Sequence, residues 1–210
     1  MSNSVEEIVY LVDDDAAVRD ALSLLIRSIG IKSKAYGDPA AFLEDIQGDE
    51  IGCLVLDIRM PALNGFAVQE RLSAMGSCLP IILITGHGDI AQCRRAFQNG
   101  AVDFLTKPID ENTLIESLQK AIQHGREQWA SKRRTNDVRA RLQKLTARER
   151  SIFDLVSDGL PNKVIADRLR LSLRTVETYR ASVFEKLDAS STADLVKLKV
   201  LDSTWKKSIP

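Results

Sequence analysis

The first half of the chain alternates short apolar runs with longer amphipathic stretches. Residues 8–12 are apolar almost throughout and predict a buried strand, whereas residues 16–29 carry apolar side chains at helical spacing until Gly30 ends the helix. The same alternation predicts further strands at 32–36, 53–56, 81–84 and 101–105, and further helices at 39–46, 65–75, 89–99 and 110–124. Five strands alternating with five helices are typical of an α/β doubly wound parallel sheet, whose strands are apolar because helices cover both faces.

The pattern changes at about Gly125. Residues 125–143 are polar and charged and predict a linker, with a helical extension of the preceding segment as the alternative. No strand-like run follows, and helical spacing continues to about Leu201. The organisation expected is therefore a first domain at 1–124, the linker at 125–143, an all-α domain at 144–201 and a tail at 202–210.

The charge of the chain is divided unevenly. Its net charge is zero, but residues 1–124 hold 10 Lys and Arg against 18 Asp and Glu, and residues 125–210 hold 19 against 11. An acidic module fused to a basic one is indicated, and the basic half is the candidate for contact with a polyanion.

The compartment is indicated by what the sequence lacks. No apolar run approaches the roughly 18 residues that span a bilayer, and the acidic N-terminus has no apolar signal core. The three cysteines, Cys53, Cys78 and Cys93, are odd in number and lack metal-ligand spacing. We therefore expect a cytoplasmic protein without structural disulfides.

Polar side chains stand where the predicted strands end. Asp13 and Asp14 follow the first strand, Asp57 ends the third, Thr85 ends the fourth, and Lys107 follows the fifth. Ligands of such sheets bind beyond the carboxyl ends of the strands, and carboxylates that converge there repel one another unless a cation such as Mg²⁺ is bound. One carboxylate can then attack a phosphoryl group, whose oxygens the threonine and the lysine can hold.

Residues 5–124 resemble the receiver domains of bacterial two-component response regulators. The resemblance implies that Asp57 is the phosphoacceptor, that Thr85 grips the phosphoryl group and that Lys107 pairs with it. It also implies that Asp14, Asp57 and the backbone carbonyl of Arg59 bind Mg²⁺, helped by Asp13 from the outer shell. The matching motifs are Asp13-Asp14, Asp57-Ile58-Arg59-Met60-Pro61, Thr85-Gly86-His87-Gly88-Asp89 and Lys107-Pro108.

The same resemblance implies a switch. Phe104 stands where receivers carry an aromatic residue that turns inward when the threonine, here Thr85, moves toward the phosphoryl oxygen. The surface of the last helices then changes and exposes a dimerisation face, which is a population shift driven by a new charge. Lys107–Pro108 matches a peptide bond that is usually cis in the family. Without the resemblance, Phe104 would be interpreted as ordinary core.

The second half carries a helix-turn-helix pattern. Thr146 and Glu149 form a predicted capping box, and the helix they begin ends at Gly159. A short helix at 163–169, a tight connection and a longer helix at 174–187 follow. The side chains predicted to face the core are Val164, Ile165 and Leu169 of the short helix and Val176, Tyr179, Val183, Phe184 and Leu187 of the longer one.

Residues 144–201 resemble the LuxR-type output domain of the NarL/FixJ family, with the Thr-Gly-His-Gly-Asp run of the first half closest to the FixJ branch. The resemblance makes 174–187 the recognition helix and 192–201 the dimer surface on DNA. Glu177 stands where some members have lysine. A glutamate could accept a hydrogen bond from cytosine N4 but would repel phosphate, so the operator sequence of relatives cannot be assumed for this chain. The residues expected to contact DNA are Glu177, Thr178 and Ala181 at bases, Lys163, Thr175, Arg180 and Ser182 at phosphates or backbone, and Arg174 without an assigned role.

The predicted function is a phosphorylation-controlled transcriptional regulator rather than an enzyme. Its partners would be a sensor histidine kinase, promoter DNA, a second copy after phosphorylation and RNA polymerase. A phosphohydrolase with an aspartyl nucleophile is one alternative, but Arg59 stands where such enzymes carry a second acid. A DNA-binding protein with a vestigial receiver is the other, and the complete set of strand-end residues argues against it.

Overall fold

The computed structural model describes residues 6–48, 50–61 and 63–206. The chain divides into two compact units, Met1–Ala130 and Ser131–Pro210, whose boundary falls within one helix, α5 (Glu111–Gln143). Residues 125–143, predicted as a linker with a helical extension as the alternative, are helical as part of α5. Among the described residues, no helix combines the length and the apolar character that a membrane crossing requires.

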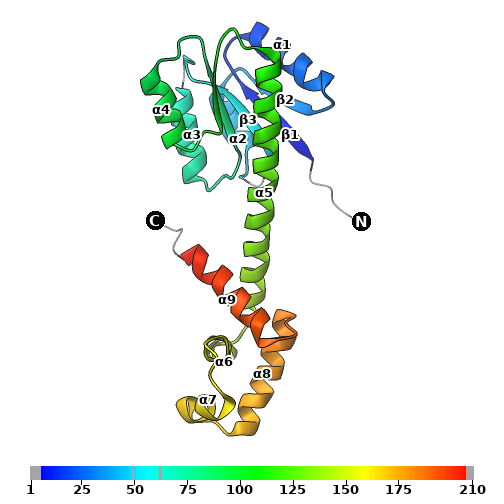
Figure 1. Cartoon of the computed structure of the whole chain (residues 1–210), viewed down its shortest axis with the longest axis vertical. Coiled ribbons are helices and arrows are strands. Elements are labelled where there is room, and N and C mark those ends of the chain that lie inside the picture. The colour runs from blue at the N-terminus through cyan, green and yellow to red at the C-terminus, as the bar shows by residue number, and fades with distance from the viewer. Residues whose placement is uncertain (1–5, 49, 62, 207–210) are drawn as a thin grey trace. The chain divides into compact units, whose positions relative to one another are not determined.

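The first unit is a parallel sheet of five strands in the order β2-β1-β3-β4-β5, with helices on both faces (Figure 1). This arrangement confirms the predicted fold class. The elements, in chain order, are β1 (Glu7–Val12), α1 (Ala16–Ser28), β2 (Lys32–Tyr36), α2 (Pro39–Asp45), β3 (Ile51–Asp57), α3 (Gly65–Ala74), β4 (Ile81–Thr85), α4 (Ile90–Gln98), β5 (Asp103–Thr106) and α5.

Each face of the sheet has its own apolar core. On one face, α1 and α5 supply Leu22, Ile26, Leu114 and Leu118, which pack against the strands. On the other face, α2, α3 and α4 cover the sheet, with Phe42 fully buried there. Strands β3 and β4 are buried at every position, as expected for central strands covered on both sides.

Some predicted boundaries of the first unit were wrong. The fifth strand was expected at 101–105, but β5 runs Asp103–Thr106, because the backbone N–H of Ala101 instead closes the end of α4 by donating to Ala96 O. The helix expected at 110–124 continues to Gln143, since nothing between these residues breaks it. The other strands and helices of this unit lie within two residues of their predicted bounds.

Two glycines stand where backbone segments of the first unit approach each other closely. A Cβ on Gly125 of α5 would stand 2.5 Å from Gly52 O on β3 and 3.2 Å from Pro80 Cδ. Gly52 itself has a φ of +135°, and a Cβ there would stand 1.9 Å from Ile8 O on β1. Backbone therefore packs on backbone at this point, and no side chain fits between.

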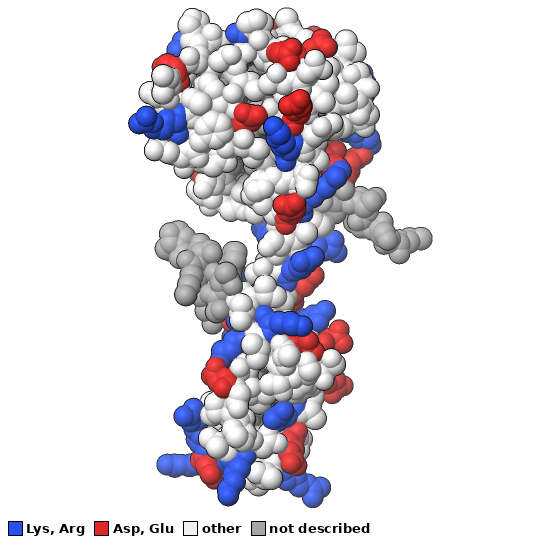
Figure 2. Space-filling view, viewed as in Figure 1, with Lys and Arg blue, Asp and Glu red and all other residues white. Residues whose placement is uncertain are grey.

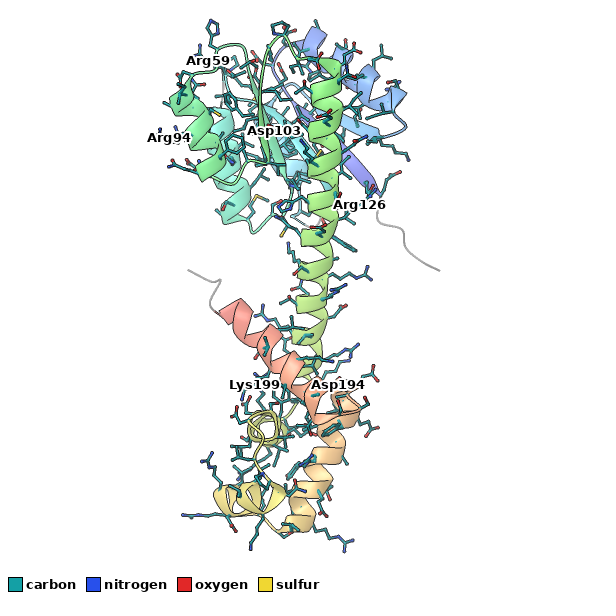
Figure 3. All side chains as sticks on the ribbon, viewed as in Figure 1. Arg59, Arg94, Asp103, Arg126, Asp194 and Lys199 are labelled. Carbon is teal, nitrogen blue, oxygen red and sulfur yellow. The ribbon has the colours of Figure 1, made fainter. Side chains whose placement is uncertain are left out.

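The second unit contains α6 (Ala147–Ser157), α7 (Asn162–Leu169), α8 (Leu173–Leu187) and α9 (Thr192–Lys206), around a core that includes the end of α5. The predicted capping box is confirmed: Thr146 and Glu149 bond reciprocally at the start of α6. Ile152, Phe153 and Val176 are completely buried in this core. Lys199 of α9, labelled in Figure 3, donates to Asp158 at 2.7 Å and ties α9 to the end of α6.

Two predictions for this unit were wrong. Val164 was expected to face inward but is 44% exposed, because its neighbours Ile165 and Ala166 occupy the core side of the short helix. The tail expected at 202–210 begins as helix, since α9 continues to Lys206 and Asp202 pairs with Arg150. The last four residues of that tail lie outside the described residues.

Candidate functional site

The register of the sheet gathers polar side chains at its carboxyl edge. Val12 pairs with Leu56, so Asp13 comes next to Asp57, which pairs in turn with Ile84 and so lies beside Thr85. Asp13, Asp57 and Thr85 are 1%, 5% and 0% exposed. Buried polar groups at three adjacent strand ends need partners, and the neighbouring strand ends supply them.

Lys107 connects two of these carboxylates. Its Nζ donates to Asp13 Oδ2 at 2.7 Å and to Asp57 Oδ2 at 2.8 Å. The peptide bond between Lys107 and Pro108 is cis, as the resemblance to receivers implied. The other oxygen of each carboxylate accepts from backbone: Asp15 N at 2.9 Å for Asp13, and Arg59 N at 3.2 Å for Asp57.

The protonation of this cluster follows from burial and pairing. Burial raises the pKa of Asp13 above its ordinary value, and the hydrogen bond from Lys107 opposes that rise without cancelling it. Burial would lower the pKa of Lys107, but its bonds to Asp13 and Asp57 outweigh burial and raise it. Lys107 is therefore a fixed cation between the two carboxylates.

Asp14 completes a set of three carboxylates suited to a divalent metal. One oxygen each from Asp13, Asp14 and Asp57 lies within 4.8 Å of the others. Asp14 is exposed, whereas the other two are buried, so the cluster opens to solvent on one side. Oxygen ligands at an open position that admits water fit Mg²⁺, which keeps several waters when bound.

Thr85 and Phe104 are placed on adjacent strands. Thr85 pairs with Thr106 across β4 and β5, and its hydroxyl accepts from His87 N at 3.3 Å. Phe104 is partly buried against the core on the α3–α4 side. The loop after Thr85 lies on that ring, because a Cβ on Gly88 would stand 3.0 Å from Phe104 Cε1. The structure thus joins the threonine loop to the aromatic side chain through direct packing.

Sequence reasoning missed Arg19 as part of this site. The guanidinium of Arg19, on α1, donates to the backbone carbonyl of Asp13 at 2.7 Å and fixes the loop that carries the carboxylate. It also packs on Gly37, where a Cβ would lie 3.2 Å from the Arg19 side chain. No motif signals this role, because an arginine one turn into an amphipathic helix is ordinarily a solvated residue.

A second candidate site lies on the outer face of α8. Arg174, Glu177, Thr178 and Ala181, all predicted to contact DNA, are exposed, as is Lys163 on α7. Figure 2 shows basic side chains over α7 and the beginning of α8. A helix that presents an exposed polar stripe flanked by cations suits contact with a nucleic acid.

The remaining predicted contact residues are held by other side chains. Thr175 shares a 2.7 Å hydrogen bond with Ser172, the N-cap of α8, and Arg180 donates to Asn162 at 2.5 Å. The Ser182 hydroxyl donates to Glu149 Oε1 at 2.7 Å. The structure therefore places Ser182 on the side of α8 that faces α6, away from the exposed stripe.

Glu149 is a buried carboxylate that sequence reasoning recognised only as a capping residue. It is 4% exposed and accepts from Thr146, Ser182 and Lys186. The bond from Lys186, followed by those from Ser182 and Thr146, lowers the pKa of Glu149 to about 2. A single charge thus joins α6 to α8.

One residue of the helix predicted to form a dimer surface, α9, is buried inside the unit. Leu195 was included in that surface but is completely buried in the core of the unit. Ala193, Val196 and Val200 remain exposed. Leu195 faces inward because α9 packs on α6 along that side of the helix.

Comparison with known families matches the two units separately. Residues 9–119 match the response regulator receiver domain. Residues 143–199 match the bacterial regulatory proteins of the luxR family. The first match contains every strand-end residue described above, and the second contains α6, α7 and α8.

Curated relatives share both units. The response regulator protein TmoT of Ectopseudomonas mendocina is 39% identical over 196 residues, which cover 93% of this chain and 89% of the relative. The transcriptional regulatory protein FixJ of Bradyrhizobium diazoefficiens is 40% identical over 190 residues, which cover 90% of this chain and 93% of the relative.

Solved structures agree with these relatives. The response regulator StyR superposes with a TM-score of 0.82 at 37% identity, over 92% of this chain and 98% of that one. Full-length FixJ from B. japonicum gives a TM-score of 0.57 at 38% identity, over 96% of this chain and 99% of that one. The strand-end carboxylates and the helix-turn-helix of this chain agree with these likenesses. The chain belongs to the NarL/FixJ family of response regulators, which join a receiver to a LuxR-type DNA-binding domain.

Proposed function

We propose that the chain is a transcriptional regulator whose DNA binding is switched by phosphorylation of Asp57. The observation that carries the proposal is the position of this carboxylate at the end of β3, buried beside Asp13 and held by Lys107 at 2.8 Å. A sensor histidine kinase is the proposed donor of the phosphoryl group, and the cytoplasm is the proposed compartment.

The reaction proposed for the site is a single displacement at phosphorus. A carboxylate oxygen of Asp57 attacks phosphorus, and the bond from phosphorus to the donor's histidine nitrogen breaks, with the electron pair leaving on that nitrogen. Phosphoryl transfer of this kind depends mainly on positioning and charge stabilisation. Lys107 is the cation available for the phosphoryl oxygens, and the Thr85 hydroxyl is the proposed neutral donor.

Magnesium is the proposed cofactor. Asp14, Asp57 and the backbone carbonyl of Arg59 would hold it, with Asp13 assisting, and three carboxylates within 4.8 Å of one another support this choice. The ion would supply positive charge to the phosphoryl oxygens. Lys107 supplies only one positive charge to the two carboxylates that it bridges, so a second cation is needed to offset all three.

The proposed output follows from the packing beside Thr85. Movement of this residue toward the phosphoryl group would carry the loop at Gly88 with it and allow Phe104 to turn inward. The altered surface would favour a dimer. When that dimer is bound to DNA, the exposed Val196 and Val200 of α9 would add contacts between the two protein copies. Two copies of α8 would then read half-sites about one helical turn apart and present the promoter to RNA polymerase.

Intact-mass measurement tests the first step. The protein is incubated with Mg²⁺ and acetyl phosphate, beside Asp57→Asn and a matched variant, Asp38→Asn. Asp38 follows β2 at the same edge of the sheet and caps α2, a role that asparagine also performs. We expect a single phosphoryl gain in the wild type and in Asp38→Asn, none in Asp57→Asn, and none after chelation of Mg²⁺.

Either of two results would overturn the proposal. A gain in Asp57→Asn equal to that of the wild type would place the phosphoryl group on another residue. If the wild type gains one phosphoryl group but binds duplex DNA with unchanged affinity, phosphorylation does not control the output.

A further inference from the structure

The exposed face of α8 carries an acidic side chain, Glu177, near the N-terminal end of the helix. Arg174, Glu177, Thr178, Ala181 and Glu185 recur at helical spacing, and all five are exposed. Arg174, Thr178 and Ala181 carry no negative charge and could approach DNA without electrostatic repulsion. The carboxylate of Glu177, which lies between them, would instead face a polyanion. A residue that weakens DNA contact in general needs a specific reason to stand there.

Glu177 has no competing partner among the described residues. Its carboxylate forms no ion pair and no side-chain hydrogen bond with them, although Arg174 stands one turn before it. The neighbouring polar residues differ in this respect, because Thr175, Arg180 and Ser182 are each bonded to another side chain. Glu177 is thus exposed, charged and free to bond a ligand.

The position of Glu177 along α8 favours base contact. Residues in the N-terminal part of a recognition helix reach the base edges of the major groove. Glu177 is the fifth residue of α8, which begins at Leu173, whereas Glu185 lies near its C-terminal end at Leu187. Basic residues that can hold the phosphates, Lys163 and Arg174, lie at the start of α7 and in the first turn of α8.

The chemistry of the groove selects one base. A carboxylate only accepts hydrogen bonds, whereas guanine offers two acceptors and thymine an acceptor and a methyl group. Adenine offers an amino donor, but its N7 acceptor stands beside that donor and repels a carboxylate. Cytosine offers the N4 amino donor alone. We infer that Glu177 reads a cytosine in each half-site of the operator, and this inference rests on the proposed DNA-binding function.

Replacement of Glu177 with glutamine should change the base that is read. A glutamine amide both donates and accepts, and it pairs with the N6 and N7 atoms of adenine. Glu177→Gln should therefore move the preference at one position of the half-site from cytosine to adenine and leave the other positions unchanged. A wrong base at a contacted position should weaken wild-type binding about 5- to 150-fold.

The test is selection from a randomised duplex DNA library. The full chain, phosphorylated with acetyl phosphate and Mg²⁺, is compared with Glu177→Gln and with Glu185→Gln, a matched variant that removes the same charge from the same exposed face nearer the end of α8. We expect one motif for the wild type and Glu185→Gln, and a cytosine-to-adenine change at a single position for Glu177→Gln.

The possible failures separate the inference from the proposed function. A motif that Glu177→Gln leaves unchanged would overturn the inference and leave DNA binding intact. A uniform loss of preference at all positions would also overturn it, because that result indicates a structural role. If the wild type enriches no sequence, the proposed DNA binding fails and the inference fails with it.

Discussion

Glu149→Gln should destabilise the second unit by about 2–4 kcal/mol. The Glu149 carboxylate accepts hydrogen bonds from the Thr146 backbone, the Thr146 hydroxyl, Ser182 and Lys186. Glutamine keeps only one acceptor oxygen, so in either orientation of the amide at least one of these donors faces an NH₂ group. Each bond to a charged acceptor contributes about 1.5–3 kcal/mol and the cap about 1 kcal/mol, part of which relaxation recovers.

Hydrogen exchange of the full chain measures this effect locally. A loss of about 2–4 kcal/mol should speed the exchange of α6 and α8 amides about 30- to 900-fold, while peptides from β3 of the first unit keep their rates. Glu185→Gln is the matched control, because Glu185 is exposed on α8 and has no side-chain bond among the described residues. Equal exchange in Glu149→Gln and wild type would refute the reasoning, as would equal acceleration in the β3 peptides.

The same comparison has a pH dependence with a defined sign. Folding lowers the pKa of Glu149 from 4.5 to about 2, chiefly through the hydrogen bond from Lys186. A lowered pKa in the folded state contributes stability that is complete above pH 4.5 and is lost as the pH falls toward 2. The difference in exchange between wild type and Glu149→Gln should therefore shrink across this interval. A difference that stays constant would show that the charge is not its source.

Three further predictions concern the first unit. Lys107→Met leaves two buried carboxylates unpaired and should lower the free energy of unfolding by about 1–3 kcal/mol. This is less than the cost for a fully buried pair, because the lysine side chain is 22% exposed. Added Mg²⁺ should raise the thermal midpoint of this variant more than that of the wild type. Gly88→Ala places a methyl group 2.7 Å from Thr106 Cγ2 and 3.0 Å from Phe104 Cε1 and should cost about 1–2 kcal/mol in thermal unfolding. Gly86→Ala, with nothing within 4 Å of the added group, should change stability by less than about 0.5 kcal/mol. Burial raises the pKa of Cys53 to about 12, so iodoacetamide should label the other two cysteines of the native protein and spare this one until denaturant is added, as peptide mapping would show.

The candidate site was predictable because the sheet repeats one geometric rule. Parallel strands bring their carboxyl ends to one edge, so residues far apart in sequence, such as Asp13 and Lys107, could be placed together before their 2.7 Å contact was seen. The capping box at Thr146 was predictable for a similar reason, since its spacing encodes a local geometry.

The sequence could not show which residues of other helices and loops each side chain contacts. Helical spacing assigned Val164 to the core, and the resemblance placed Leu195 on a dimer surface. Which side of a helix packs depends on the helices opposite it, and both assignments were wrong. Ser182 was expected beside a phosphate because it lies on the recognition helix, whereas its hydroxyl bonds Glu149 of another helix. Arg19 is a similar case, because its partner is a backbone carbonyl, which every residue possesses.

The close approach of α5 to β3 has a consequence for variation of this sequence. Gly52 and Gly125 meet backbone to backbone, so a library that varies every position should accept almost nothing but glycine at both. Neither residue belongs to the carboxylate cluster or to the exposed stripe of α8. Intolerance at Gly125 would record the space between a helix and a strand, whereas intolerance at Gly52 would record a positive φ and the close approach of β1 at Ile8. A screen for loss of regulation would recover both positions alongside Asp57 for an unrelated physical reason.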